Sequence, residues 1–94
     1  MQKLMLEGEL TIYSAAETKT QLLTFLDSAD ELEINLAEVS EIDTAGLQLL
    51  ILAKQEAKQA GKKLHFSLHS TAVLELLELA NLVALFGDPI VLSH

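Results

Sequence analysis

Cysteine is absent from this chain of 94 residues. Without cysteine the protein has no disulfide, no thiolate nucleophile and no cysteine metal ligand, and nothing indicates an oxidising compartment. Long apolar runs are missing as well: the longest are Leu49 to Ala53 and Leu82 to Phe86, far below the roughly 20 residues that span a bilayer. The first residues show neither the apolar h-region nor the small-residue cleavage site of a secretory signal, so we expect none. We therefore expect a cytoplasmic protein with no membrane span.

Positive charge is scarce. Six Lys and Arg residues stand against 14 Asp and Glu residues, a formal net charge of -8, so the phosphate backbone of a nucleic acid would be repelled. Ten of the acidic residues but only two lysines lie within residues 1–43, which therefore carry the whole net charge. We expect one acidic end or face, either a solubilising surface or a docking surface for a basic partner.

Glycine is also rare, and this excludes several kinds of site. The four glycines make neither a P-loop nor a Gly-x-Gly-x-x-Gly turn, so no nucleotide cofactor is expected. No Gly-x-Ser-x-Gly nucleophile elbow occurs, and the carboxylates follow an exposed acidic run where strong pKa shifts are not expected. The sequence thus argues against an enzyme and for a binding protein.

Hydrophobic residues make up 50% of the chain, enough for one core, and no linker or repeat divides it. We expect a single domain over residues 1–94. From Leu4 to Ile12 every second residue is apolar or glycine, which predicts a strand or a tight hairpin. The same alternation predicts a strand over Leu32 to Leu36 and another over Leu64 to Leu68. The segment from Ala37 to Asp43 is interpreted as a polar loop.

Helical spacing predicts three helices between these strands. The first follows a capping-box pattern at Ser14 to Glu17 and ends near Asp27. The second covers residues 45–60, with Gly61 as its C-terminal cap. The third is capped by Ser70 or Thr71 and reaches about Ala80, and Pro89 to Leu92 is a candidate edge strand.

Strands that alternate with helices predict parallel pairing through crossover helices. Sheets of this kind that are covered on both faces have continuously apolar strands, whereas each strand here alternates. We therefore expect an α/β fold in which the helices pack on one face of the sheet and the other face is wet.

The segment Glu41 to Leu47 is the most distinctive motif. It brings Thr44 to the start of the longest helix, where unpaired N–H groups and the macrodipole favour negative charge. A phosphate on Thr44 would be stabilised by that backbone, and its charge would alter contacts made by the loop. The alternative is that Thr44 only caps the helix, since Thr is a common N-cap residue.

Four segments together resemble the STAS domain of sulphate transporters and anti-sigma factor antagonists. They are Gly8 to Thr11, Leu32 to Leu36, Val39 to Leu47, and Ala80 to Leu82 before Phe86. The most specific is Asp43 to Leu47, which is similar to the Asp-Ser-Ser-Gly-Leu motif of that family. The resemblance implies a mixed four- or five-stranded sheet with helices packed on one face.

The resemblance also implies a function. In the bacterial antagonists an anti-sigma factor kinase phosphorylates the first serine of the motif, and the unphosphorylated form binds the anti-sigma factor and frees the sigma factor. Thr44 corresponds to that serine, so the implied phosphorylation site is Thr44 and the implied partner-binding residues are Asp43, Thr44, Ala45, Gly46 and Leu47.

The chain departs from the family pattern at three positions. Thr44 replaces the first serine, Ala45 replaces the second, and Asn35 stands where an aspartate is frequent. Threonine still accepts phosphate. These differences also suit relatives that accompany chemotaxis proteins, and relatives that serve as the small cytoplasmic STAS subunit of a phospholipid-transporting ABC complex, whose partner is an ABC transporter ATPase.

Three other features have plainer interpretations. His65 and His69 alternate along one strand but have no acidic or cysteine ligand nearby, so we expect no metal site. Lys54, Lys58 and Lys62–Lys63 are a candidate basic stripe, although complementing the helix dipole explains them as well. The leucines of residues 45–60 face more than one side, which leaves apolar surface for a partner or a homodimer.

Overall fold

The computed structural model describes residues 1–67 and 69–79. Six elements follow one another along this part of the chain. They are β1 (Gln2–Leu10), α1 (Ala15–Leu26), β2 (Glu31–Ile42), α2 (Thr44–Gln59), β3 (Lys63–Ser67) and α3 (Thr71–Leu79). The predicted alternation of strands and helices is confirmed, and the first element is a strand rather than a hairpin.

The three strands form one parallel sheet in the order β1-β2-β3, so β2 is central. This confirms the predicted parallel pairing. The described residues contain three strands, and the fourth or fifth strand of a STAS sheet is not confirmed. The candidate edge strand at Pro89 to Leu92 lies outside the described residues.

The predicted loop from Ala37 to Asp43 is wrong, because β2 continues through it to Ile42. The strand pairs with β1 along its whole length, but its register shifts twice, between Met5 and Glu7 and between Gly8 and Glu9. Each shift adds one residue to β2, a β-bulge that breaks the alternation by which strands are recognised. At the first bulge the Asn35 side chain accepts a hydrogen bond from the N–H of Ala37 at 2.8 Å.

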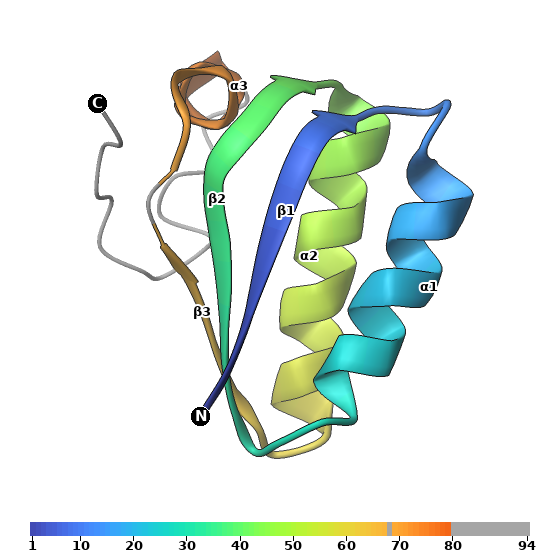
Figure 1. Ribbon diagram of the computed structural model, residues 1–94, viewed down its shortest axis with the longest axis vertical. Coiled ribbons are helices and arrows are strands. Elements are labelled where there is room, and N and C mark those ends of the chain that lie inside the picture. Colours follow the sequence, from blue (N-terminus) through green and yellow to red (C-terminus); the bar gives the residue numbers. More distant parts are fainter. Residues whose placement is uncertain (68, 80–94) are drawn as a thin grey trace.

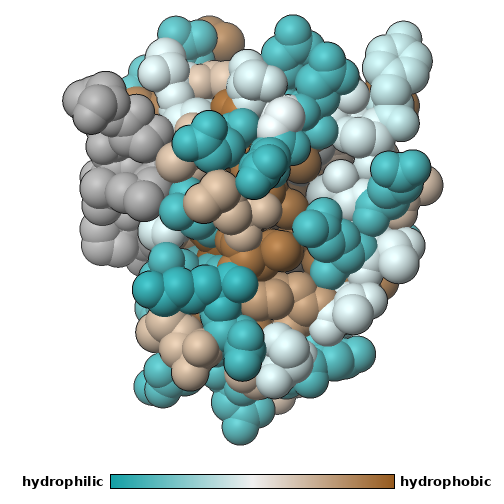
Figure 2. Space-filling view, in the orientation of Figure 1, coloured by the Kyte–Doolittle hydropathy of each residue, from teal (hydrophilic) through white to brown (hydrophobic). Residues whose placement is uncertain are grey.

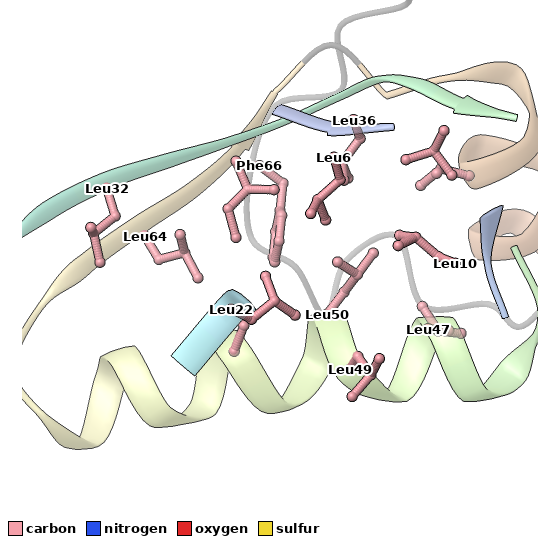
Figure 3. Packing of buried hydrophobic residues seen from close by; sticks show 14 of the residues in the cluster. Leu6, Leu10, Leu22, Leu32, Leu36, Leu47, Leu49, Leu50, Leu64 and Phe66 are labelled. Atoms are coloured by element: carbon pink, nitrogen blue, oxygen red, sulfur yellow. The ribbon is translucent and has the colours of Figure 1, made fainter. Parts of the chain in front are cut away.

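The core lies between the sheet and α2, and Figure 3 shows leucines from both meeting there. Leu32, Ile34 and Leu36 point from β2 into this layer and are fully buried, as is Leu50 of α2. Burial of each such side chain stabilises the folded state by roughly 1.5–3 kcal/mol relative to leaving it exposed. Figure 2 shows that apolar surface reaches the outside between β1 and α1, framed by hydrophilic residues.

The opposite face of the sheet carries polar side chains, as the alternation predicted. Glu7 and Glu9 of β1 are exposed there, and Met5 on the same parity is 48% exposed. Figure 1 shows α1 and α2 together on one side of the sheet, with α3 beside the far end of β2. The helix over Thr71–Leu79 begins with the predicted Ser70 cap, whose hydroxyl accepts from the N–H of Val73 at 3.3 Å.

The predicted capping box at α1 is wrong, although the helix itself ends at Leu26 as expected. Ser14 has helical backbone angles (φ -106°, ψ 0°), whereas an N-cap side chain reaches back only from an extended backbone. Its hydroxyl instead accepts from the N–H of Thr11 at 3.1 Å and donates to the carbonyl of Glu9 at 2.9 Å. Ser14 therefore stabilises the loop between β1 and α1.

Candidate interaction site at the start of α2

Asp43 connects two parts of the chain that are distant in sequence. One carboxylate oxygen accepts a hydrogen bond from the N–H of Gly46 at 2.9 Å, and the other accepts from the N–H of Ile12 at 3.0 Å. Asp43 is thus the N-cap of α2, with the extended backbone that this role requires (φ -115°, ψ -174°). The interpretation of Thr44 as the cap is wrong, because the residue before it supplies the capping oxygen.

These hydrogen bonds also set the protonation of Asp43. The N–H groups of Gly46 and, next in size, Ile12 stabilise the carboxylate and hold the pKa of Asp43 below its ordinary value of 3.8, against a smaller opposing effect of burial. Asp43 is therefore charged at neutral pH, where it serves as a charged acceptor at the positive end of α2.

Gly46 allows α2 to approach the end of β1 closely. A Cβ atom at this position would lie 2.0 Å from the carbonyl oxygen of Leu10, much closer than any van der Waals contact. The same carbonyl accepts a hydrogen bond from the N–H of Asp43 at 3.2 Å. Glycine is therefore required here for lack of a side chain, so that the β2–α2 junction packs on the β1 backbone.

The five motif residues occupy different environments. Thr44, the first residue of α2, is exposed, and Ala45 is half-buried. Gly46 and Leu47 are buried, with Leu47 only 3% exposed and part of the hydrophobic core. Of the five, Thr44 thus presents its side chain outward, while Gly46 and Leu47 hold the start of the helix against the rest of the molecule.

The loop between β1 and α1 adds apolar surface that the sequence interpretation missed. Ile12 is 63% exposed and Tyr13 is 94% exposed, and the hydrogen bond from Ile12 to Asp43 places this loop next to the start of α2. The strand parity had assigned Ile12 to the buried face, but β1 ends at Leu10 and the chain turns away. Figure 1 shows this loop and the start of α2 at the same end of the molecule.

The histidines do not form a shared site. His65 is exposed on β3, whereas His69 lies beyond the strand and is 1% exposed. In the described ranges, 1–67 and 69–79, no three His, Cys, Asp or Glu residues are placed to hold a metal ion. Within those same ranges, no helix is both long enough and apolar enough to cross a membrane.

Known proteins share this fold. The STAS domain of the SulP transporter from Vibrio cholerae has a TM-score of 0.67 and 24% identity, covering 95% of this chain and 73% of its own. The anti-sigma factor antagonist SpoIIAA in its unphosphorylated form has a TM-score of 0.69 and 16% identity, covering 97% of this chain and 79% of its own. Residues 1–88 match the family described as "Mlab, STAS domain". The chain therefore belongs to the STAS family.

Proposed function

We propose that this protein is a non-enzymatic interaction module, similar in action to an anti-sigma factor antagonist, whose partner binding is controlled by phosphorylation of Thr44. The partner is an anti-sigma factor kinase or a related chemotaxis-type signalling protein. The supporting observation is that Thr44 is exposed at the first residue of α2, directly after a capped and hydrogen-bonded junction.

The junction gives the Thr44 hydroxyl a defined position. Its neighbour Asp43 makes four hydrogen bonds: the carboxylate accepts two, the backbone N–H donates to the carbonyl of Leu10, and the backbone carbonyl accepts from the N–H of Leu47. The helix that follows is anchored in the core by Leu47 and Leu50. A kinase thus meets a hydroxyl on an ordered backbone, and little conformational entropy is lost when a partner binds this surface.

Phosphorylation at this position changes charge more than it changes the fold. A phosphate adds about two negative charges, which the N-terminus of α2 stabilises in part. The carboxylates of Glu41 and Asp43 are close in sequence, so the surface becomes strongly negative. A partner that fits the neutral threonine then meets repulsion and a bulky group, and its affinity falls.

The contact surface that we propose is centred on Thr44 and includes Ile12 and Tyr13. Asp43 and Ala45 frame the hydroxyl, while Gly46 and Leu47 act from below by fixing the helix start. Exposed tyrosine and isoleucine beside a phosphorylatable hydroxyl supply the apolar anchor that protein interfaces use, and tyrosine is prominent among binding hot spots.

The test is phosphate mapping with a matched variant. The purified chain is incubated with ATP and the anti-sigma factor kinase of its own organism, and the modified residue is located by peptide mass spectrometry. We expect one phosphate on Thr44 in the wild type and none in Thr44→Ala. Modification of both proteins, or of neither, would remove Thr44 from this role.

A second candidate is a subunit of a transporter, the small cytoplasmic STAS subunit of a phospholipid-transporting ABC complex. The observation that favours it is the likeness to the STAS domain of a SulP transporter. In this case Thr44 contributes packing or a hydrogen bond to a permanent interface with an ABC transporter ATPase. Co-purification of such an ATPase that phosphatase treatment does not change would favour this function over the first.

A further inference from the structure

The positive charge of this acidic protein is concentrated at one place. Four of its six basic residues, all of them lysines, line a single open cavity of about 290 Å³ between the C-terminal half of α2 and the start of β3. His65 completes the polar lining, and Ala57 and Leu64 supply apolar wall. Among the described residues, 1–67 and 69–79, no acidic residue lines this lysine cavity.

The turn after α2 brings the lysines together. Lys54 and Lys58 are four residues apart and so share a face of the helix. Gly61 then adopts a left-handed backbone (φ 73°), and the N–H of Lys62 bonds the carbonyl of Ala57 at 2.9 Å. This reversal places Lys62 and Lys63 beside the last turns of the helix that they follow.

Two of the ammonium groups are held in place by the backbone. Lys54 donates to the carbonyl of Leu64 at 2.6 Å and lies 5.7 Å from the ring centre of Phe66, and Lys62 donates to the carbonyl of Leu26. Each tether therefore fixes the position of a positive charge in the lining of the cavity.

The other two ammonium groups belong to Lys58 and Lys63. In residues 1–67 and 69–79, neither Lys58 nor Lys63 forms a salt bridge. Asp27 and Glu56 line an adjacent depression together with Lys62, so this lysine is partly compensated. The C-terminus of α2 contributes about half a negative charge, which is small against four ammonium groups.

We propose that the lysine cavity binds the phosphate group of a small phosphate ester. Lysine ammonium groups act as point charges that suit a phosphate, and the apolar wall of Ala57 and Leu64 contacts the rest of the ester. The volume is at the lower end of the range for small-molecule sites, which fits a compact ligand. The ester is either a soluble metabolite or the headgroup of a lipid.

This site is separate from the proposed interaction surface. Figure 1 shows the end of α2 and the start of β3 together at the opposite end of the helix from Thr44. The 16 residues of α2 span roughly 24 Å. Loss of phosphate binding in the lysine cavity therefore says nothing against the role of Thr44, and the reverse also holds.

The primary test is an NMR titration of the whole chain with glycerol 3-phosphate at low salt. We expect saturable amide shifts confined to residues 54–65. The double variant Lys58→Gln/Lys63→Gln should bind at least tenfold more weakly. The control Lys3→Gln/Lys19→Gln removes the same charge from the two exposed lysines outside the cavity and should bind within twofold of the wild type.

A second arm distinguishes the source of the phosphate. Vesicles of phosphatidylglycerol and of phosphatidylcholine are compared by flotation with the wild type and both double variants. Binding to phosphatidylglycerol alone, lost in Lys58→Gln/Lys63→Gln, identifies a lipid headgroup; shifts with glycerol 3-phosphate but no flotation identify a soluble ester. Two results would overturn the proposal. One is amide shifts that do not saturate, combined with no flotation of either kind of vesicle. The other is an equal loss of binding in the two double variants while their circular dichroism is unchanged.

Discussion

The backbone N–H of Ile12 donates a hydrogen bond to the carboxylate of Asp43 at 3.0 Å, across 31 positions of sequence. The other oxygen of the same carboxylate caps α2 through Gly46. One side chain thus fixes the exposed β1–α1 loop relative to Thr44. The geometry of the proposed interaction surface therefore depends on Asp43 even if Asp43 never contacts the partner.

The Asp43 carboxylate makes stability depend on acid. Because its pKa is lower in the folded state than its ordinary value of 3.8, the charged form stabilises the fold above that value, and the stabilisation is lost as the pH falls through the folded-state pKa. We expect Asp43→Asn to unfold at a lower temperature than the wild type at pH 7. The difference should shrink below pH 3.8 in thermal scans followed by circular dichroism.

The control for this experiment is Asp30→Asn, which removes the same charge from an exposed carboxylate outside the junction. The unfolding temperature of Asp30→Asn should differ little from that of the wild type at pH 7. If the difference in unfolding temperature between Asp43→Asn and the wild type stays constant down to pH 2, the charge of Asp43 does not stabilise the fold through these hydrogen bonds.

Replacement of Gly46 by alanine should destabilise the protein strongly. The new Cβ would overlap the carbonyl of Leu10, so the helix start must move away from β1, and we expect a loss of about 3 kcal/mol, the upper end for overpacking. Gly61→Ala is the matched control, since its Cβ meets no atom within 4 Å and only the left-handed backbone opposes it.

For Gly61→Ala the expected cost is about 1 kcal/mol. Urea unfolding of both variants at one temperature measures the two losses. If Gly46→Ala is no worse than Gly61→Ala, the close approach of α2 to β1 is not what requires glycine at position 46.

Thr44→Ala should leave stability within about 0.5 kcal/mol of the wild type, because the cap is Asp43 and Thr44 is an exposed first residue of the helix. Asp43→Ala should lower stability clearly, since it removes both side-chain hydrogen bonds. The urea concentrations at the unfolding midpoints of the two variants give their order of stability, and Asp43→Ala should have the lower midpoint. The opposite ranking would return the capping role to Thr44.

Tyr13→Ser should weaken partner binding about tenfold, the size expected for an aromatic anchor that contributes more than 1 kcal/mol. The side chain is almost fully exposed, so the free energy of unfolding should hardly change. Affinity for the anti-sigma factor kinase is measured by calorimetry. Leu23→Ser, another exposed apolar position but on α1, is the control and should bind normally.

A negative charge at position 44 tests the switch directly. Thr44→Asp should weaken partner binding while leaving the fold intact, because an acidic side chain in the first turn is favourable to the helix dipole. Calorimetry with the same kinase compares it with Thr44→Ala. Equal affinity of wild type, Thr44→Ala and Thr44→Asp would exclude control by charge at this residue.

Local pattern was sufficient for most elements. The spacing of leucines and alanines predicted α2 to within one residue at each end, and Gly61 after it, because helix formation and termination depend on neighbours a few positions apart. The alternation around Ile34 and Phe66 predicted both strands and a wet sheet face for the same reason. The motif from Asp43 to Leu47 indicated the family.

Contacts between distant segments determined the rest. Whether Asp43 or Thr44 caps α2, and whether Ala37 to Ile42 is a loop or a strand, depends on pairing with β1 and on a hydrogen bond from Ile12. Such contacts leave no periodic signal in either segment, since each partner is chosen by the packing of the other. For that reason the composition and short-range pattern identified an acidic α/β domain, whereas folding alone placed the loop of Ile12 and Tyr13 next to the start of α2 and gathered four lysines around one cavity.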